Sequence, residues 1–167
     1  GFKKTSDLIA VSFGVSETAP NTFIEEEDAL QLDVLNNEIA VILAVDIDLT
    51  PPDAIAGVDT QTSASVTATT LLGVGNLSQS NTIVAARDSI MAAGMVDSGV
   101  GFSRKADSTY TGDLDYLAII STNNFFVQLK GFANLVPKGC TGRVWLYRAK
   151  ADASTYAALV QSEVLSA

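Results

Sequence analysis

The stretch Glu38–Leu49, with the sequence EIAVILAVDIDL, decides the fold class. Its odd positions are all large aliphatic residues, whereas its even positions include Asp46 and Asp48. Side chains of a β-strand alternate between two faces, so this pattern predicts a strand with one apolar face. Twelve residues at ~3.3 Å each would span about 40 Å, which is long for a strand. The pair Pro51-Pro52 predicts its end, because proline donates no hydrogen bond to a sheet.

The segment before this strand predicts a hairpin. Apolar residues alternate with polar ones over Leu30–Val34, and Asn36-Asn37 then joins this run to the long strand. Asparagine tolerates positive φ, which favours a tight turn at this point. We therefore expect the two runs to pair as neighbouring antiparallel strands.

Further segments have a period of two or are rich in strand-forming residues. We predict strands over Asp7–Val15, Ser63–Leu72, Tyr116–Ser121, Phe125–Phe132 and Gly142–Lys150. Turns are predicted at Gly73-Val74-Gly75, Thr122-Asn123-Asn124 and Val136-Pro137-Lys138-Gly139. Asn81–Val96 fits two structures, either a helix capped by Asn81 or a strand followed by an irregular crossing.

The C-terminal segment changes to a helical period. Asp152 is a favourable N-cap, and the apolar residues after it fall on one helical face, namely Tyr156, Leu159, Val160 and Val164. This predicts a short amphipathic helix over residues 153–165. A helix this short is not stable alone, so we expect its apolar face to dock on its own domain. Residues 1–6 are expected to form a flexible N-terminus.

The chain has 167 residues, which fits one domain over residues 1–167. Hydrophobic residues make up 47% of it, enough to bury a sizeable core. Strand-like segments recur along the chain and one helix closes it. This predicts an all-β fold, a single jelly-roll β-sandwich of about eight antiparallel strands with a short C-terminal helix.

The composition excludes several kinds of catalytic chemistry. There is no histidine, which rules out Ser-His-Asp and Cys-His catalysis and histidine-ligated metals. The single cysteine, Cys140, rules out intramolecular disulfides and thiolate clusters and is interpreted as inert packing. We therefore expect no enzyme activity, no catalytic or metal-binding residues and no cofactor.

Charge is unevenly distributed along the chain, whose net charge is −9. Residues 1–86 hold two lysines against twelve acidic residues, whereas residues 87–167 are nearly balanced. An acidic surface repels a phosphate backbone, so direct nucleic-acid binding is not expected. The acidic surface either serves solubility or meets a basic face on a neighbouring copy.

Carboxylates raise two site hypotheses. The run Glu25-Glu26-Glu27-Asp28 has the oxygen ligands of a cation site, but it lacks the spacing of a calcium loop. We favour a solvated loop that enters a strand. Asp46 and Asp48 could act as the paired acids of a glycoside hydrolase, but we favour an outward strand face. Asp113 and Asp115 are expected to cap a turn.

Aromatic residues raise a third hypothesis. Those in the predicted C-terminal strands could form a sugar-binding platform, namely Phe125, Phe126, Trp145 and Tyr147. Aromatic side chains in central strands more often belong to the core, and we favour that interpretation.

The C-terminal third carries a family resemblance. It reads LAIISTNNFFVQLKG over residues 117–131 and CTGRVWLYRAKAD over residues 140–152, followed by a short helix that ends in LVQSE. This part resembles the closing hairpin and tail of small single jelly-roll capsid proteins of icosahedral, internal-membrane viruses of archaea and bacteria. The rest of the chain matches that family only in strand count and in its Ser/Thr/Ala-rich composition.

This resemblance implies a structural capsid protein located in the virion shell. Its copies would stand with their strands roughly perpendicular to the capsid and pack side by side into capsomers. A second, larger capsid protein and an internal lipid membrane would be its neighbours, which fits the lack of a basic genome-binding arm. The alternative is a carbohydrate-binding or adhesin-type β-sandwich module.

Overall fold

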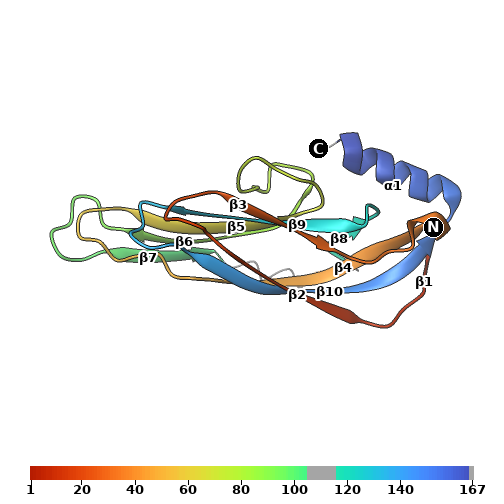
Figure 1. Ribbon diagram of the computed structural model, residues 1–167, viewed down its shortest axis with the longest axis horizontal. Coiled ribbons are helices and arrows are strands. Elements are labelled where there is room, and N and C mark those ends of the chain that lie inside the picture. The colour runs from red at the N-terminus through yellow and green to blue at the C-terminus, as the bar shows by residue number, and fades with distance from the viewer. Residues whose placement is uncertain (105–115, 166–167) are drawn as a thin grey trace.

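The computed structural model describes residues 1–104 and 116–165, which form two antiparallel sheets and one C-terminal helix (Figure 1). The elements are β1 (Phe2–Lys4), β2 (Ile9–Ser16), β3 (Ile24–Ala29), a 3-10 turn (Val34–Asn36), β4 (Glu38–Leu49), β5 (Thr60–Thr67), β6 (Thr82–Met91), β7 (Val100–Arg104), β8 (Ala118–Ile120), β9 (Asn124–Phe132), β10 (Gly139–Ala151) and α1 (Ala153–Leu165). Within the described ranges, no helix is both long and apolar enough to cross a membrane.

The strand order is that of a jelly roll. One sheet, here sheet A, has the order β1-β10-β4-β8, and β2 pairs along the same edge of β10 as β1. The other, sheet B, has the order β3-β9-β5-β6-β7. If β1 and β2 are one interrupted strand, the chain folds like a long hairpin whose arms pair from the outside inward: β1/β2 with β10, β3 with β9, β4 with β8, and β5 with β6. This rolled arrangement confirms the predicted fold class, and β7 adds a fifth strand to sheet B.

A bulge in β4 corrects the prediction that its odd positions form one face. Neighbouring residues of β10 pair with Ala44 and Ile42, which leaves Leu43 as an extra residue. A one-residue shift moves every later side chain to the opposite face. Val45 therefore shares the main core with Ile42, an even position. Ile39 instead faces a second, smaller cluster beneath α1.

The predicted hairpin at Asn36-Asn37 is wrong. β3 ends at Ala29 and pairs with β9 of sheet B, whereas β4 lies in sheet A, so the link between them crosses from one sheet to the other. Two apolar side chains in this link, Leu30 and Leu32, are buried in the main core, which explains their alternation without a strand. Asn37 does adopt positive φ, at 58°, just before β4.

The segment that fitted two structures is a strand. β6 runs antiparallel to both β5 and β7, and the loop before β7 follows it. The other predicted strands are found with shifted ends; β8 keeps only three residues, and β5 begins and ends earlier than Ser63–Leu72. Asp113 and Asp115 lie outside the described residues.

Helix α1 docks on its own domain as predicted. Asp152 caps it by accepting a hydrogen bond of 2.7 Å from the Thr155 backbone N–H. Tyr156 packs on the second cluster, but Val164 is 62% exposed, which corrects its placement on the docking face. Its neighbour Glu163 is the buried residue of the last turn.

The N-terminal residues form a paired strand, whereas the sequence favoured a flexible end. Phe2 lies opposite Ala151 in β10, and Lys4 lies opposite Ala149. The Lys4 ammonium also lies 5.2 Å from the ring centroid of Tyr147. Pairing with β10 therefore places residues 2–4 beside α1, at the end of the sandwich where Figure 1 marks the N-terminus.

Candidate interaction surfaces

Four loops meet at the end of the sandwich opposite α1, which we call the loop end (Figure 1). They are residues 17–23, 50–59, 92–99 and 133–138. Glu17, 6% exposed, holds two of them together. Its carboxylate accepts hydrogen bonds from the backbone N–H groups of Thr22, Gly131 and Lys138 at 2.8–3.0 Å. Three donors satisfied by one buried carboxylate fix these chain segments relative to one another.

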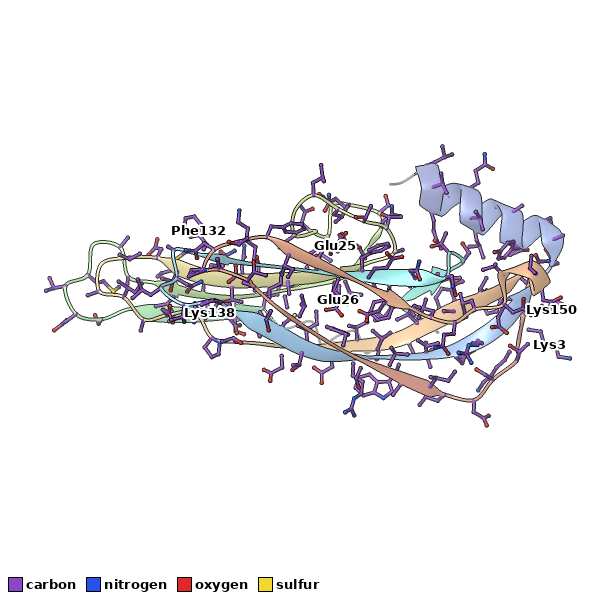
Figure 2. All side chains as sticks on the ribbon, in the orientation of Figure 1. Lys3, Glu25, Glu26, Phe132, Lys138 and Lys150 are labelled. Atoms are coloured by element: carbon purple, nitrogen blue, oxygen red, sulfur yellow. The ribbon has the colours of Figure 1, made fainter. Side chains whose placement is uncertain are left out.

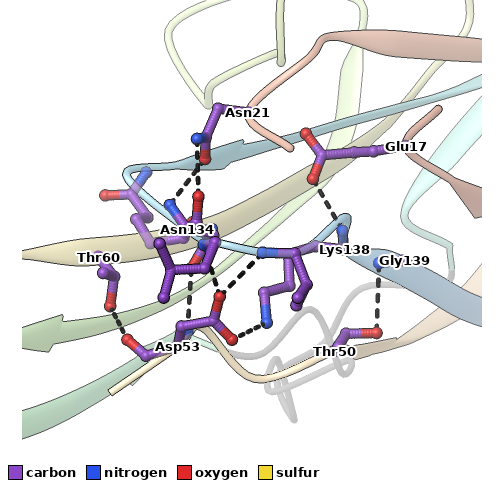
Figure 3. Close-up of polar contacts among 11 residues, drawn as sticks. Glu17, Asn21, Thr50, Asp53, Thr60, Asn134, Lys138 and Gly139 are labelled. Carbon is purple, nitrogen blue, oxygen red and sulfur yellow. Dashed lines mark hydrogen bonds and ion pairs between the residues drawn. The ribbon is translucent and has the colours of Figure 1, made fainter. Parts of the chain in front are cut away.

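An ion pair between a buried lysine and a half-buried aspartate connects the loop after β4 to the loop before β10 (Figure 3). The Lys138 ammonium, 4% exposed, donates to Asp53 at 2.7 Å. The other oxygen of Asp53 accepts from the backbone N–H groups of Leu135 and Val136. The hydrogen bond from Lys138, followed by that from Leu135, holds the pKa of the Asp53 carboxyl below its ordinary value. The Asp53 carboxylate is therefore charged at neutral pH, and both of its oxygens accept hydrogen bonds from residues 135–138.

Two further contacts complete the network. Asn134, 5% exposed, exchanges hydrogen bonds with Asn21 and also accepts one from the Asp53 backbone N–H. Asp59 accepts from the backbone N–H groups of Ala92 and Ala93 at 2.8 Å each, and these bonds lower its pKa. All four loops are thus joined by polar contacts, which makes the loop end a defined surface rather than a set of free loops.

Exposed apolar side chains gather at this end. Six of them form what we call the loop-end patch: Met91 (47% exposed), Val100 (48%), Phe102 (59%), Phe132 (62%), Leu135 (73%) and Val136 (51%). Phe102 and Phe132 lie in one row on the outer face of sheet B, with Gln61 and Ser89 between them. A shallow groove of about 350 Å³ runs along this row beside Phe102. Large apolar groups exposed together on a rigid surface are typical of protein contact sites.

The outer face of sheet B is basic next to this patch. Arg87 on β6 lies directly opposite Arg104 on β7, and both side chains are exposed. Lys130 on β9 lies in the same row, with Ser63 between it and Arg87. We call Arg87, Arg104 and Lys130 the basic row.

The acidic run forms a strand, not a loop. Glu25–Asp28 lies in β3, the edge strand of sheet B, so its carboxylates alternate between two faces and do not converge on one point. Figure 2 shows Glu25 and Glu26 on different sides of β3. Glu25 is also engaged, since it accepts from the Leu71 N–H at 2.9 Å and from the Gln128 amide at 2.8 Å. Within residues 1–104 and 116–165, no three acidic or cysteine side chains are placed to hold a metal ion.

Asp28 is the carboxylate of this run in the least favourable environment. Its Oδ2 atom is buried without a hydrogen-bond partner among the described residues. Burial, and then repulsion from Glu26, raises the pKa of its carboxyl. The charged carboxylate is therefore held at a cost to the folded state.

The outer face of sheet A places the Asp46/Asp48 pair next to Trp145, although they are far apart in the sequence. Asp46 and Asp48 point outward and are exposed, as predicted. Arg143 on β10 lies opposite Asp46, and Trp145 follows on the same face. These residues line a groove of about 530 Å³. Trp145 is half-buried there, so the prediction that it belongs to the core is wrong.

The other aromatic candidates do not join this groove. Phe125 is 1% exposed and lies in the main core, where its ring packs edge-on against Phe13. Tyr147 lies under Lys4 beside α1. Cys140 is 4% exposed, and burial raises the pKa of its thiol to about 12, so it is an inert packing residue as predicted.

No pattern in the sequence indicated three charged residues that hold distant segments of the fold together. Glu17, Lys138 and Glu163 are isolated charged residues in the sequence, and each is buried by contacts with distant segments. Only the turn residues around Lys138 could have indicated that a loop meets others there.

Comparisons with known proteins give weak structural likenesses. No protein-family model matches the sequence, and no curated protein matches it. A solved structure of Desmodium yellow mottle tymovirus is 14% identical over 89% of this chain and 91% of that chain, with a TM-score of 0.34. An empty head of turnip yellow mosaic virus is 10% identical over 90% and 85%, with a TM-score of 0.32. A VP2 subviral particle of infectious bursal disease virus is 9% identical over 92% of this chain and 34% of that chain, with a TM-score of 0.27. We base the proposed function on the chain's own surfaces, because these TM-scores are low.

Proposed function

We propose that this protein is a structural subunit of a viral capsid and packs side by side with copies of itself. The observation that carries the proposal is the loop-end patch, six large apolar side chains exposed on a jelly roll whose loops are joined by buried polar contacts. Jelly rolls are a frequent architecture of capsid subunits. Fold alone does not assign function, so the surface has to supply the specific support.

The rigidity of the loop end supports an assembly role. A shell subunit loses little conformational entropy on association when its contact surface is already fixed. Here the Lys138–Asp53 pair and the Glu17 carboxylate fix the loops before any partner binds. Burial of the patch between copies would remove its apolar area from water, which favours association by about 25 cal/mol per Å² before the costs of binding.

The finer parts of the proposal come from the family resemblance. A shell of this kind would place the subunit in the virion, with its strands roughly perpendicular to the capsid surface. A second capsid protein would complete the shell, and a lipid membrane would lie inside it. The role proposed for the chain is structural, not catalytic.

Serine substitutions in the patch test this function. We expect Phe102→Ser and Phe132→Ser together to lower the assembled mass measured by light scattering. Leu72→Ser is the matched control, since Leu72 is fully exposed, at 101%, in the loop between β5 and β6, away from the patch. Equal assembly of both variants would refute the role of the patch.

A second candidate function is carbohydrate binding, which the groove around Trp145 favours. A half-exposed indole offers a face for stacking on a sugar ring, and Asp46 and Arg143 beside it offer hydrogen-bonding groups. Titration with oligosaccharides would then change the Trp145 fluorescence, and Trp145→Ala would abolish binding. An unchanged spectrum across a broad glycan panel would reject this candidate.

A further inference from the structure

The two edges of sheet B are chemically opposite. Its strand order places β3 at one edge and β7 at the other. β3 carries four consecutive carboxylates, of which Glu26 and Glu27 are exposed. The β7 edge carries Arg104 and, on the adjacent strand, Arg87. One edge of the sheet is therefore acidic and the other basic.

Among the residues that the structure describes, the two arginines are in an unfavourable arrangement. Like charges directly opposite each other on neighbouring strands destabilise a sheet. Arg87 and Arg104 form such a pair, and Lys130 adds a third positive charge in the same row. An anionic partner at this edge would offset the repulsion.

The β7 edge is also uncovered within residues 1–104 and 116–165. All five residues of β7 are exposed, and among the described strands β7 pairs with β6 alone. An edge of this kind offers backbone N–H and C=O groups to a neighbour as well as its side chains. The apolar residues Val100 and Phe102 on the same strand belong to the loop-end patch.

We propose that the basic β7 edge of one subunit binds the acidic β3 edge of the next copy. This inference rests on the proposed function and names the faces that meet. A contact between two different edges is heterologous, and it builds a ring of copies when the rotation from one copy to the next closes. The net charge of −9 favours a protein neighbour over a nucleic acid at this edge.

The register of sheet B is compatible with this contact. Glu27, an exposed carboxylate of β3, lies in the row of Phe126, Thr67 and Thr82, and Thr82 is five residues from Arg87 along β6. Five residues correspond to about 17 Å along a strand. A stagger of that size between neighbouring copies brings the acidic and basic rows to the same level.

Charge exchange between the edges tests the proposal. We expect Arg87→Glu with Arg104→Glu to lower the association constant of the copies about tenfold or more, measured by sedimentation. Glu26→Lys with Glu27→Lys is expected to do the same. The chain that carries all four changes should assemble again, because every contact then has exchanged charges. The matched control is Lys3→Glu with Lys150→Glu, a cationic pair on neighbouring strands of sheet A, at the end of the sandwich near α1.

The outcomes separate this inference from the proposed function. A wild-type chain that never assembles refutes both, whereas assembly that is unchanged by the arginine substitutions refutes only the edge contact. Loss of assembly without recovery in the fourfold variant also refutes it, provided that thermal melting shows each variant folded. Sedimentation with vesicles of anionic phospholipid covers the competing partner: binding that depends on the arginines, with assembly unaffected, would assign the basic edge to a membrane and overturn the proposal.

Discussion

Glu17→Ala should be among the most destabilising single substitutions at the loop end. The change removes the acceptor of three backbone N–H groups, of which those of Gly131 and Lys138 are buried and that of Thr22 is half-buried. A buried donor left unpaired costs about 1–3 kcal/mol. The two buried donors together cost about 4 kcal/mol of stability. The half-buried Thr22 N–H can bond to water instead and adds little.

Glu17→Gln should cost less, because its amide oxygen can still accept two of the three bonds. Only the Lys138 N–H then loses its acceptor, for a cost of about 2 kcal/mol. For a domain of this size, 1 kcal/mol shifts Tm by about 2–4 °C, so the alanine variant should melt about 8–16 °C lower than the wild type.

Urea unfolding at neutral pH, followed by circular dichroism, measures both variants. Asp7→Ala serves as the control, because Asp7 is exposed and should change the free energy of unfolding by less than about 0.5 kcal/mol. The reasoning is refuted if Glu17→Ala lies within about 1 kcal/mol of the wild type, or if glutamine is as costly as alanine.

Three further predictions concern other buried groups. Glu163→Ala should release the end of α1 and speed its cleavage in limited proteolysis, because the Glu163 carboxylate accepts the N–H and hydroxyl groups of Ser121 and Thr122; unchanged cleavage would contradict this. Asp28→Asn should raise the free energy of unfolding at neutral pH. The raised pKa of Asp28 means that its charged form destabilises the folded state above that pKa, and this penalty disappears as the pH falls through it. A stability gain of the asparagine variant that persists at acidic pH would refute this cause. The Cys140 thiol should react with a thiol reagent only after unfolding, and rapid labelling of the native protein would contradict its burial.

The sequence was informative where periodicity acts locally. Alternation located β2, β4, β9 and β10, and the cap at Asp152 located the start of α1. Alternation and capping depend on residues close together in the sequence, so tertiary contacts do not change them. Strand number and the closing helix were therefore enough to predict the jelly-roll class.

Features that depend on distant contacts were not predictable. The extra residue Leu43 looks like any other strand residue, and only pairing with β10 makes it a bulge that exchanges the two faces of β4. Leu30 and Leu32 resembled a strand because a buried link can show the same alternation. Val164 and Glu163 differ by one position on a helix, and the donors of Ser121 and Thr122 decide which of them turns inward.

The candidate surfaces were also hidden in the sequence. Asp46 and Trp145 are far apart along the chain, and only the pairing of β4 with β10 places them in one groove. The charge asymmetry between the two halves of the chain did suggest complementary faces. It could not show that they are the two edges of one sheet, which follows from the strand order.

The mass and shape of the native assembly test the central claim most directly. Light scattering and electron microscopy of the same sample would measure both. A capsid subunit with the surfaces described here should form particles or regular arrays of copies. A monomer of 17.5 kDa that persists at high concentration, with and without candidate partner proteins, would contradict the proposed function.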